Sequence, residues 1–183
     1  MDLAALAADV RRITVAVTHA NGVAGGSGIV WAPGWVVTNA HVAARARVIV
    51  RRDDGERVEG RVVARDRRCD LALLHAPDLG VAGARCVDGV ELRLESLVVA
   101  VGHPFGVPGA VSAGIVQAVG PLVPGGRCWI QADLRLAPGN SGGPLADARG
   151  HVVGVNAMMA GSLALAIPVG EVRRFVASVA TPT

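Results

Sequence analysis

The chain has 183 residues, enough for one domain or two small lobes that share an interface. Apolar residues make up 51% of it, Gly and Pro contribute 24 and 10 residues, and Lys and Tyr are absent. The net charge is only +3, and the arginines alternate with acids, as in Arg51-Arg52-Asp53-Asp54. Because no stripe of Arg with interleaved aromatics occurs, the sequence argues against a nucleic-acid partner.

Metal and membrane sites are also disfavoured. Cys69, Cys86 and Cys128 show no CxxC spacing, which argues against zinc, and their odd number argues against a disulfide framework, although Cys86 and Cys128 can pair in an oxidising compartment. The uncharged stretch Ser96–Gly126 is broken by several prolines, so we expect no membrane span. The start of the chain shows no signal-peptide pattern, and the compartment stays open.

The first half of the chain predicts one helix and then short strands. Leu3–Arg12 has helical spacing and ends in arginine, which suits the negative end of the helix dipole. Turn signals such as Pro33-Gly34 separate the apolar runs that follow. The predicted strands are Ile13–Thr18, Gly28–Trp31, Trp35–Thr38, Arg47–Arg51, Arg57–Arg65 and Asp70–His75.

The second half repeats this pattern after Ala76–Val90, a Gly-rich segment that we interpret as a connection between lobes 1–80 and 81–183. Its predicted strands are Leu97–Val101, Val111–Val119, Arg127–Ala132, Pro144–Ala146, His151–Asn156 and Leu163–Ile167. Val169–Val179 then places its apolar residues on one helical face. Two sets of about six strands with a closing helix indicate an all-β fold of two small antiparallel barrels, although strand number alone does not separate barrels from a sandwich.

Ser141 is the candidate nucleophile. A serine hydroxyl needs a base to take its proton and donors to hold the oxyanion. The run Gly139-Asn140-Ser141-Gly142-Gly143-Pro144 supplies a backbone that can turn sharply, and the Gly139 and Ser141 amides, with Asn140 between them, form the predicted oxyanion hole. Taken alone, the same run is also consistent with an ordinary Gly-rich turn.

His41 is the candidate base because it follows directly on the apolar strand Trp35–Thr38 and the dipeptide Asn39-Ala40. A strand end holds a base rigidly and still lets it reach a cleft. The remaining histidines sit in loops, turns or at other strand ends, which are ordinary structural positions: His19, His75, His103 and His151.

Asp70 is the candidate carboxylate that orients His41. It leads directly into the apolar run Leu71–Leu74, where burying an unpaired charge is costly. A turn-capping role for Asp70 is the alternative, and Asp66, in an Arg-rich setting, is the rival carboxylate. The order His, Asp, Ser is that of chymotrypsin, and differs from that of subtilisin and of the α/β-hydrolases.

With these segments in place, the chain resembles the trypsin-like proteases of the HtrA/Deg family. The similarity runs in order from about Gly26 to Pro168. It rests on the histidine segments Gly26–Val30 and Gly34–Val42, the aspartate segment Asp70–Leu74, the second-barrel blocks Val101–Gly106, Ser112–Val116 and Ile130–Asp133, the serine segment Pro138–Leu145 and the strand Ala164–Pro168.

The resemblance implies two six-stranded barrels and a serine endopeptidase of protein quality control. It would have no cofactor, would act on unfolded or misfolded polypeptides, and would prefer small aliphatic residues at the cleavage site. Carried over residue by residue, Leu136 and Leu163 line the specificity pocket, and Leu163–Leu165 pair with the substrate backbone by strand addition. The resemblance implies a bacterial periplasmic or extracytoplasmic location, and a cytoplasmic location also stays open.

The chain departs from the family pattern in several places. No PDZ domain follows the protease segment, and the aromatic residues that build the family's trimer have no counterpart, so monomer and trimer both stay open. Ala164 replaces the family's usual Gly and narrows the pocket entrance, whereas we expect Arg135 to face solvent. A catalytically silent peptide-binding or chaperone-like module on the same fold is the alternative function.

Overall fold

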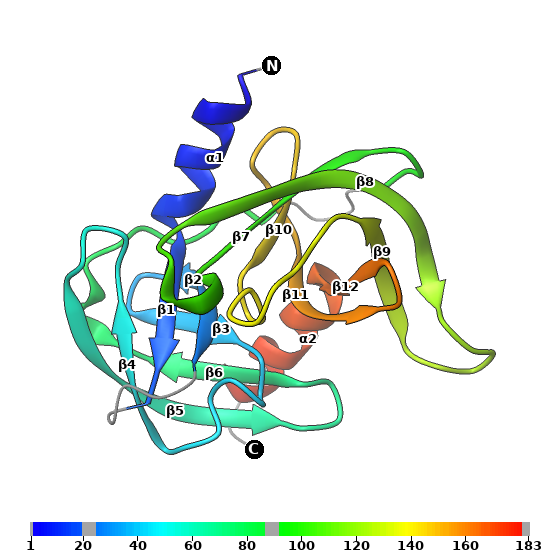
Figure 1. The fold of residues 1–183 in the computed structure, drawn as a ribbon. Helices are drawn as coiled ribbons and strands as arrows, with labels where there is room; N and C mark the ends of the chain where they lie inside the picture. Colours follow the sequence, from blue (N-terminus) through cyan, green and yellow to red (C-terminus); the bar gives the residue numbers. More distant parts are fainter. Residues whose placement is uncertain (1, 20–24, 87–91, 181–183) are drawn as a thin grey trace.

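The strands form two closed antiparallel barrels of six strands each (Figure 1). The structure is a computed structural model that describes residues 2–19, 25–86 and 92–180. The first barrel has the order β1-β2-β3-β6-β5-β4. Its strands are β1 (Thr14–Thr18), β2 (Gly26–Ala32), β3 (Trp35–Thr38), β4 (Arg47–Arg51), β5 (Arg57–Asp66) and β6 (Leu71–His75).

The second barrel has the order β10-β11-β12-β9-β8-β7 and is followed by a helix. Its strands are β7 (Leu97–Gly102), β8 (Ala110–Pro121), β9 (Cys128–Asp133), β10 (Pro144–Asp147), β11 (Val152–Ala160) and β12 (Leu163–Pro168), and the helices are α1 (Leu3–Arg12) and α2 (Val169–Ala180). Short 3₁₀ turns lie at Pro77–Leu79 and Pro104–Gly106. The predicted two-barrel, chymotrypsin-like fold is thus confirmed, and the sandwich alternative is wrong because both sheets close.

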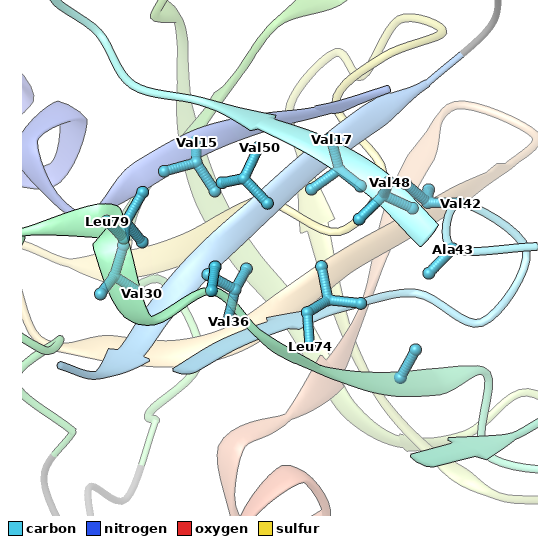
Figure 2. Packing of buried hydrophobic residues seen from close by; sticks show 12 residues of the cluster. Val15, Val17, Val30, Val36, Val42, Ala43, Val48, Val50, Leu74 and Leu79 are labelled. Atoms are coloured by element: carbon cyan, nitrogen blue, oxygen red, sulfur yellow. The ribbon is translucent and has the colours of Figure 1, made fainter. Parts of the chain in front are cut away.

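Small branched side chains fill the first barrel. Its interior cluster is dominated by valines from β1 to β4, with Leu74 and Leu79 completing it (Figure 2). β-branched residues pack well on a pleated surface, and a six-stranded barrel leaves room for side chains of about this size. The many valines in this part of the sequence therefore fit the narrow interior of the first barrel.

β6 is buried on both faces, which explains its unbroken apolar sequence. Ala72 and Leu74 point into the first barrel. Leu71 and Leu73 point the other way, into a second cluster with Leu165 of β12 and Phe175 of α2. Alternate residues of a strand face opposite sides, so Leu71–Leu74 joins the barrel core to the junction between barrels and thereby fixes Asp70 at that junction.

The N-terminal helix α1 covers the outside of the second barrel. Asp2 caps it by accepting hydrogen bonds from the Ala4 and Ala5 amides at 2.9 and 3.2 Å. Its buried face, including Leu6 and Val10, packs with residues of β7 and β10. No helix in the described part of the chain is long and apolar enough to cross a membrane.

The connection between the barrels begins with the 3₁₀ turn Pro77–Leu79, and residues 87–91 of it lie outside the described residues. Cys69, Cys86 and Cys128 are all free, so the Cys86–Cys128 disulfide considered from the sequence is not formed. Burial raises the pKa of both Cys69 and Cys86 to about 11, which makes these two thiols poor nucleophiles.

Candidate active site

His41 lies on a tight turn at the end of β3. The Val42 and Ala43 amides both donate to the Asn39 carbonyl, at 3.2 and 3.1 Å, and so shape the turn around His41. Arg65 of β5 holds the far side of this turn by donating through Nη2 to the Ala43 carbonyl. The imidazole itself is 52% exposed, so it is fixed at its base and accessible at its tip.

Asp70 lies directly against His41. Its Oδ2 is 2.8 Å from His41 Nδ1, and its Oδ1 accepts a hydrogen bond from the His41 amide at 3.1 Å. The carboxylate is only 19% exposed, and Asn39 donates through Nδ2 to the Asp70 carbonyl at 2.9 Å. A carboxylate in this position fixes the Nδ1–H tautomer and leaves Nε2 free to accept a proton.

Asp66, the rival carboxylate, caps a turn instead. Its Oδ1 accepts hydrogen bonds from the Arg68 amide at 2.8 Å and the Cys69 amide at 3.4 Å. The hydrogen bond from the Arg68 amide is the main reason that the pKa of Asp66 is lowered. Of the two carboxylates that the sequence offered, the structure places Asp70 against His41.

Ser141 sits where the two barrels meet. Its carbonyl accepts a hydrogen bond from the Ser27 amide of β2 at 2.8 Å. Gly142 follows with φ +86°, and a Cβ there would lie 2.1 Å from the Ser27 carbonyl oxygen and 2.2 Å from Thr38 Oγ1. Only glycine fits both the backbone angle and the space, so this glycine allows the serine turn to touch the first barrel.

The Ser141 hydroxyl does not point at the base in this structure. It donates to the Ala157 carbonyl of β11 at 2.8 Å. Ala157 is the extra residue of a bulge, because β12 pairs with Asn156 and then with Met158. Among the described residues, no hydrogen bond joins Ser141 Oγ to His41, so the hydroxyl must rotate before His41 can take its proton.

The turn before Ser141 offers two free amides. The Pro138 carbonyl accepts from the Phe105 amide at 3.0 Å, and the Asn140 carbonyl accepts from the Gly143 amide at 3.1 Å. Because a trans peptide directs its N–H opposite to its C=O, these bonds fix the Gly139 and Ser141 amides. Neither amide has a protein acceptor within the described part of the chain.

Asn140 does not belong to the oxyanion hole. Its amide donates to the Ala137 carbonyl at 3.0 Å and is therefore already used within the turn. Of the residues expected to form the oxyanion hole, the Gly139 and Ser141 amides stay the candidate donor pair, and two donors are the number that such a hole commonly provides.

Ser27 ties the oxyanion turn to both barrels. Its hydroxyl donates to the Gly139 carbonyl at 2.7 Å and accepts from the His103 amide at 2.9 Å. Its own carbonyl accepts from Thr38 Oγ1 at 2.6 Å. Ser27 is fully buried, and its hydroxyl and backbone are both used to hold the chain around Ser141.

The residues expected to bind substrate separate into two groups. Leu136 packs against an interior cluster of the second barrel that contains Ala164, whereas Leu163 is half-buried at the start of β12. Leu165 is 1% exposed and packs in the cluster between the barrels. The Leu165 side chain therefore cannot line a substrate pocket.

Strand addition at β12 is also excluded by the pairing. Ala164 and Leu165 pair with Met159 and Met158 of β11 on one side and with Ala132 and Gln131 of β9 on the other. A third strand has no edge left there. By contrast, β10 pairs with β11 only up to Val155, so the edge of β11 opposite β12 carries no strand after Asn156 in the described chain.

Of the other histidines, His75 and His151 make contacts elsewhere, whereas His103 lies next to the Ser141 turn. His75 stacks near Trp35 with ring centroids 4.6 Å apart, and His151 pairs with Asp147 at 3.4 Å. His103 is 5% exposed and lies behind the oxyanion turn, where burial is the main cause that lowers its pKa to about 4. His103 is therefore a weak proton acceptor, and its burial keeps it out of reach of a substrate, so it is a poor candidate for the base. Arg135 is exposed, as expected.

Sequence reasoning assigned no role to the side chains that hold these turns. They are Ser27, Asn39, Arg65 and Arg127, the last of which donates to the Cys69 carbonyl in the turn before Asp70. Ser27 carried a signal, since it stands between two glycines in a segment otherwise built of strand formers. The two arginines carried none, because each binds a turn that is distant in sequence.

Other sites are less well formed in the described residues. No group of three or more His, Cys, Asp or Glu is placed to hold a metal ion there. A cavity of about 590 Å³ lies between the end of α1, the β4–β5 turn and the connection between the barrels, and none of His41, Asp70 and Ser141 lines it.

Two barrels with His and Asp on one and Ser on the other define the architecture of the chymotrypsin-like serine proteases. The chain belongs to the trypsin-like peptidase family, because residues 26–155 match its Trypsin-like peptidase domain. The expected resemblance to HtrA/Deg proteases is confirmed for this protease domain.

Individual relatives support this placement. The chain is 42% identical over 138 residues to a "Probable periplasmic serine endoprotease DegP-like" of Ectopseudomonas mendocina, and 41% identical over 140 residues to a protein of the same name from Hahella chejuensis. Each match covers 73% of this chain and 29% of the relative, so the chain spans about 29% of the length of these relatives. The solved structure "HtrA-type protease AlgW with decapeptide" shares the fold, with a TM-score of 0.87 at 24% identity over 98% of this chain and 67% of that one.

Proposed function

We propose that this chain is a serine endopeptidase that hydrolyses peptide bonds through an acyl-enzyme on Ser141. The observation that carries the proposal is the 2.8 Å contact of Asp70 with His41 Nδ1, beside a serine turn whose Gly139 and Ser141 amides are free. In this mechanism His41 takes the hydroxyl proton, Asp70 stabilises the imidazolium, and the two amides hold the oxyanion.

The substrate backbone would add to the free edge of β11 at Ala157–Ala160. Met158, which is 47% exposed, lies on this edge beyond the end of β10. An extended peptide gains main-chain hydrogen bonds from such an edge, and its side chains alternate between pocket and solvent. Leu136 and Met159 pack beside Ala164, so an apolar pocket at this point would favour small aliphatic residues and discriminate only modestly between them.

Substrate binding would also release the nucleophile. The Ala157 carbonyl that accepts from Ser141 Oγ lies on the same free edge. An amide of an added peptide strand would compete for this carbonyl, and the displaced hydroxyl would turn to His41. The resting contact of Ser141 is thus compatible with catalysis and would be exchanged for a substrate contact.

The relatives and the free edge of β11 support a proposal for the substrate class and the cellular setting. Strand addition requires an extended backbone, which unfolded or misfolded polypeptides provide, and we infer a role in protein quality control. The curated relatives are named as periplasmic, which supports an extracytoplasmic location. The aligned structure is described with a decapeptide, which supports a polypeptide substrate. No cofactor is needed for this mechanism.

The decisive experiment compares wild type with Ser141→Ala in two assays. We expect wild type to react with a fluorophosphonate probe and to cleave casein, and Ser141→Ala to do neither. Ser178→Ala, which removes a hydroxyl from α2, is the matched control and should retain both signals. If the folded wild type binds peptides but neither labels nor cleaves, the chain is a silent peptide-binding module.

A further inference from the structure

Arg127 joins three separate parts of the molecule. It immediately precedes β9, and its side chain is 25% exposed. Nη2 donates to the Cys69 carbonyl of the first barrel at 3.0 Å and contacts Glu171 Oε1 of α2 at 2.8 Å. The guanidinium also lies 4.3 Å from the centroid of the Trp129 ring. One side chain thus connects the second barrel, the C-terminal helix and the turn that carries Asp70.

The turn that Arg127 holds has an unusual backbone. Asp70 has φ +53°, a left-handed conformation that residues other than glycine seldom adopt. The Cys69 carbonyl and the Asp70 amide belong to one planar peptide, so a bond that fixes this carbonyl restrains φ of Asp70. Asn39 holds the other side by donating to the Asp70 carbonyl. The strained residue is therefore restrained both before and after its Cα.

The chemistry of arginine suits this position. The two N–H bonds of Nη2 allow one donor for the carbonyl and one for the carboxylate, while the flat guanidinium stacks on Trp129. Glu171 and Trp129 thereby orient the guanidinium, which loses less freedom when it binds the Cys69 carbonyl. A lysine would keep the charge but would lose the stacking and the fixed direction of the donors.

We propose that Arg127 is a positioning residue that keeps the Asp70 carboxylate against His41. Arg127 touches neither side chain, and it acts through the peptide that precedes Asp70. The proposal rests on the proposed serine endopeptidase function and adds a contribution of the second barrel and α2 to the base. Asp70, one of the two proposed catalytic residues of the first barrel, is thus held in part by a side chain from outside that barrel.

The test compares Arg127→Gln and Arg127→Lys with wild type, with rates corrected by active-site titration with a fluorophosphonate. We expect Arg127→Gln to lower kcat by about 10- to 100-fold with little change in KM, because a small misplacement of a catalytic group has effects of this size. The acid limb of the pH–rate profile should move to lower pH, since a displaced carboxylate stabilises the imidazolium less. Arg127→Lys should recover part of the loss.

Two further variants separate positioning from folding. Arg57→Gln removes an exposed arginine of β5 and should leave kcat and the pH profile unchanged. Glu171→Gln keeps Arg127 but removes its carboxylate, so it should cause a smaller loss in the same direction and covers the case in which Arg127→Gln does not fold. An unchanged kcat and acid limb in folded Arg127→Gln, or in Glu171→Gln if Arg127→Gln does not fold, would overturn the proposal.

A measurement without turnover keeps this proposal separate from the proposed function. The proton on His41 Nδ1 that is held by Asp70 should give a far-downfield proton NMR signal in wild type. We expect this signal to weaken or disappear in Arg127→Gln and to persist in Arg57→Gln. If wild type lacks activity but Arg127→Gln still loses the signal, the function is wrong and the positioning role stands; a signal unchanged in folded Arg127→Gln contradicts the positioning role.

Discussion

The two barrels differ in how far each has arranged its proposed catalytic residues. In the first barrel, His41 and Asp70 are already in contact at 2.8 Å, and the turns that carry them are bound to Asn39 and Arg65. In the second barrel, the Ser141 turn is held in place, but its hydroxyl donates to the Ala157 carbonyl. The base is therefore assembled by folding, whereas the nucleophile needs one further rotation.

The difference arises from where the restraining bonds come from. The turns of His41 and Asp70 lie at the ends of adjacent strands, because β3 and β6 pair directly from Trp35↔His75 to Thr38↔Ala72. The Ser141 turn depends on bonds across the junction, through the Ser27 amide and hydroxyl. A pair within one sheet is fixed mainly by strand register, to which Arg127 adds one bond from the second barrel, whereas a contact between barrels depends throughout on how the barrels pack.

The largest effect on activity is expected from a substitution in the His41–Asp70 pair, which is already in contact. Asp70→Asn keeps the shape but presents an amide donor to His41 Nδ1, which favours the wrong tautomer. We expect a loss of about 10⁴-fold in kcat, as in other triad proteases, measured by peptide cleavage after active-site titration. Asp66→Asn is the matched control, since its Oδ1 can still cap the turn. Equal losses in the two variants would contradict the assignment of Asp70.

A smaller effect on activity is expected from removing the Ser27 hydroxyl, which links the first barrel to the Ser141 turn. Ser27→Ala leaves the Gly139 carbonyl and the His103 amide without their buried partner. We expect a loss of about 1–3 kcal/mol in the free energy of unfolding, measured by urea denaturation. We also expect kcat to fall by about 10- to 100-fold at similar KM, because the Gly139 amide moves with its turn.

The control for Ser27→Ala is Ser178→Ala, which removes a hydroxyl that also donates to a carbonyl at 2.7 Å, but in α2. This variant should keep the wild-type kcat. If Ser27→Ala is destabilised yet fully active per titrated site, the oxyanion turn does not depend on the first barrel, and the contrast between the two halves is weaker than we infer.

The sequence predicted the strands and the neighbouring positions of His41 and Asp70 for a physical reason. Period-two burial and turn residues are local signals, and they place β3 and β6 close to their observed bounds. Ser141, His41 and Asp70 were predicted as a triad because each stands at the boundary between a strand and a turn, in the order known from chymotrypsin. These features can be read along the chain without knowledge of contacts.

The features that sequence reasoning missed depend on strand pairing, on turn geometry and on contacts between distant residues. The substrate strand was placed on β12 by the resemblance to the HtrA/Deg family, but only the pairing shows that both of its edges are occupied. Sequence reasoning included Asn140 in the oxyanion hole because it could not foresee the bond of the Asn140 amide to the Ala137 carbonyl, which depends on the turn geometry. Arg127 and Cys69 are 58 residues apart, so no local pattern could connect them.

The smallest effect concerns the pH dependence of the second barrel. Burial lowers the pKa of His103 to about 4 from an ordinary value of 6.5. Between these two values the unfolded chain binds a proton that the folded chain does not, so the free energy of unfolding falls as pH drops from 6.5 to 4. At about 1.4 kcal/mol per pH unit, the upper limit of this effect is about 3 kcal/mol.

His103→Asn should remove this contribution and flatten the decline in stability. The measurement is urea denaturation at pH 7, 6 and 5, with the slope compared between variants because other groups titrate in the same range. His75→Gln, which changes a histidine near Trp35, should keep the wild-type slope. An identical slope in His103→Asn and wild type would show that His103 finds a partner for its proton, and the oxyanion turn would then be less sensitive to acid than the burial of His103 implies.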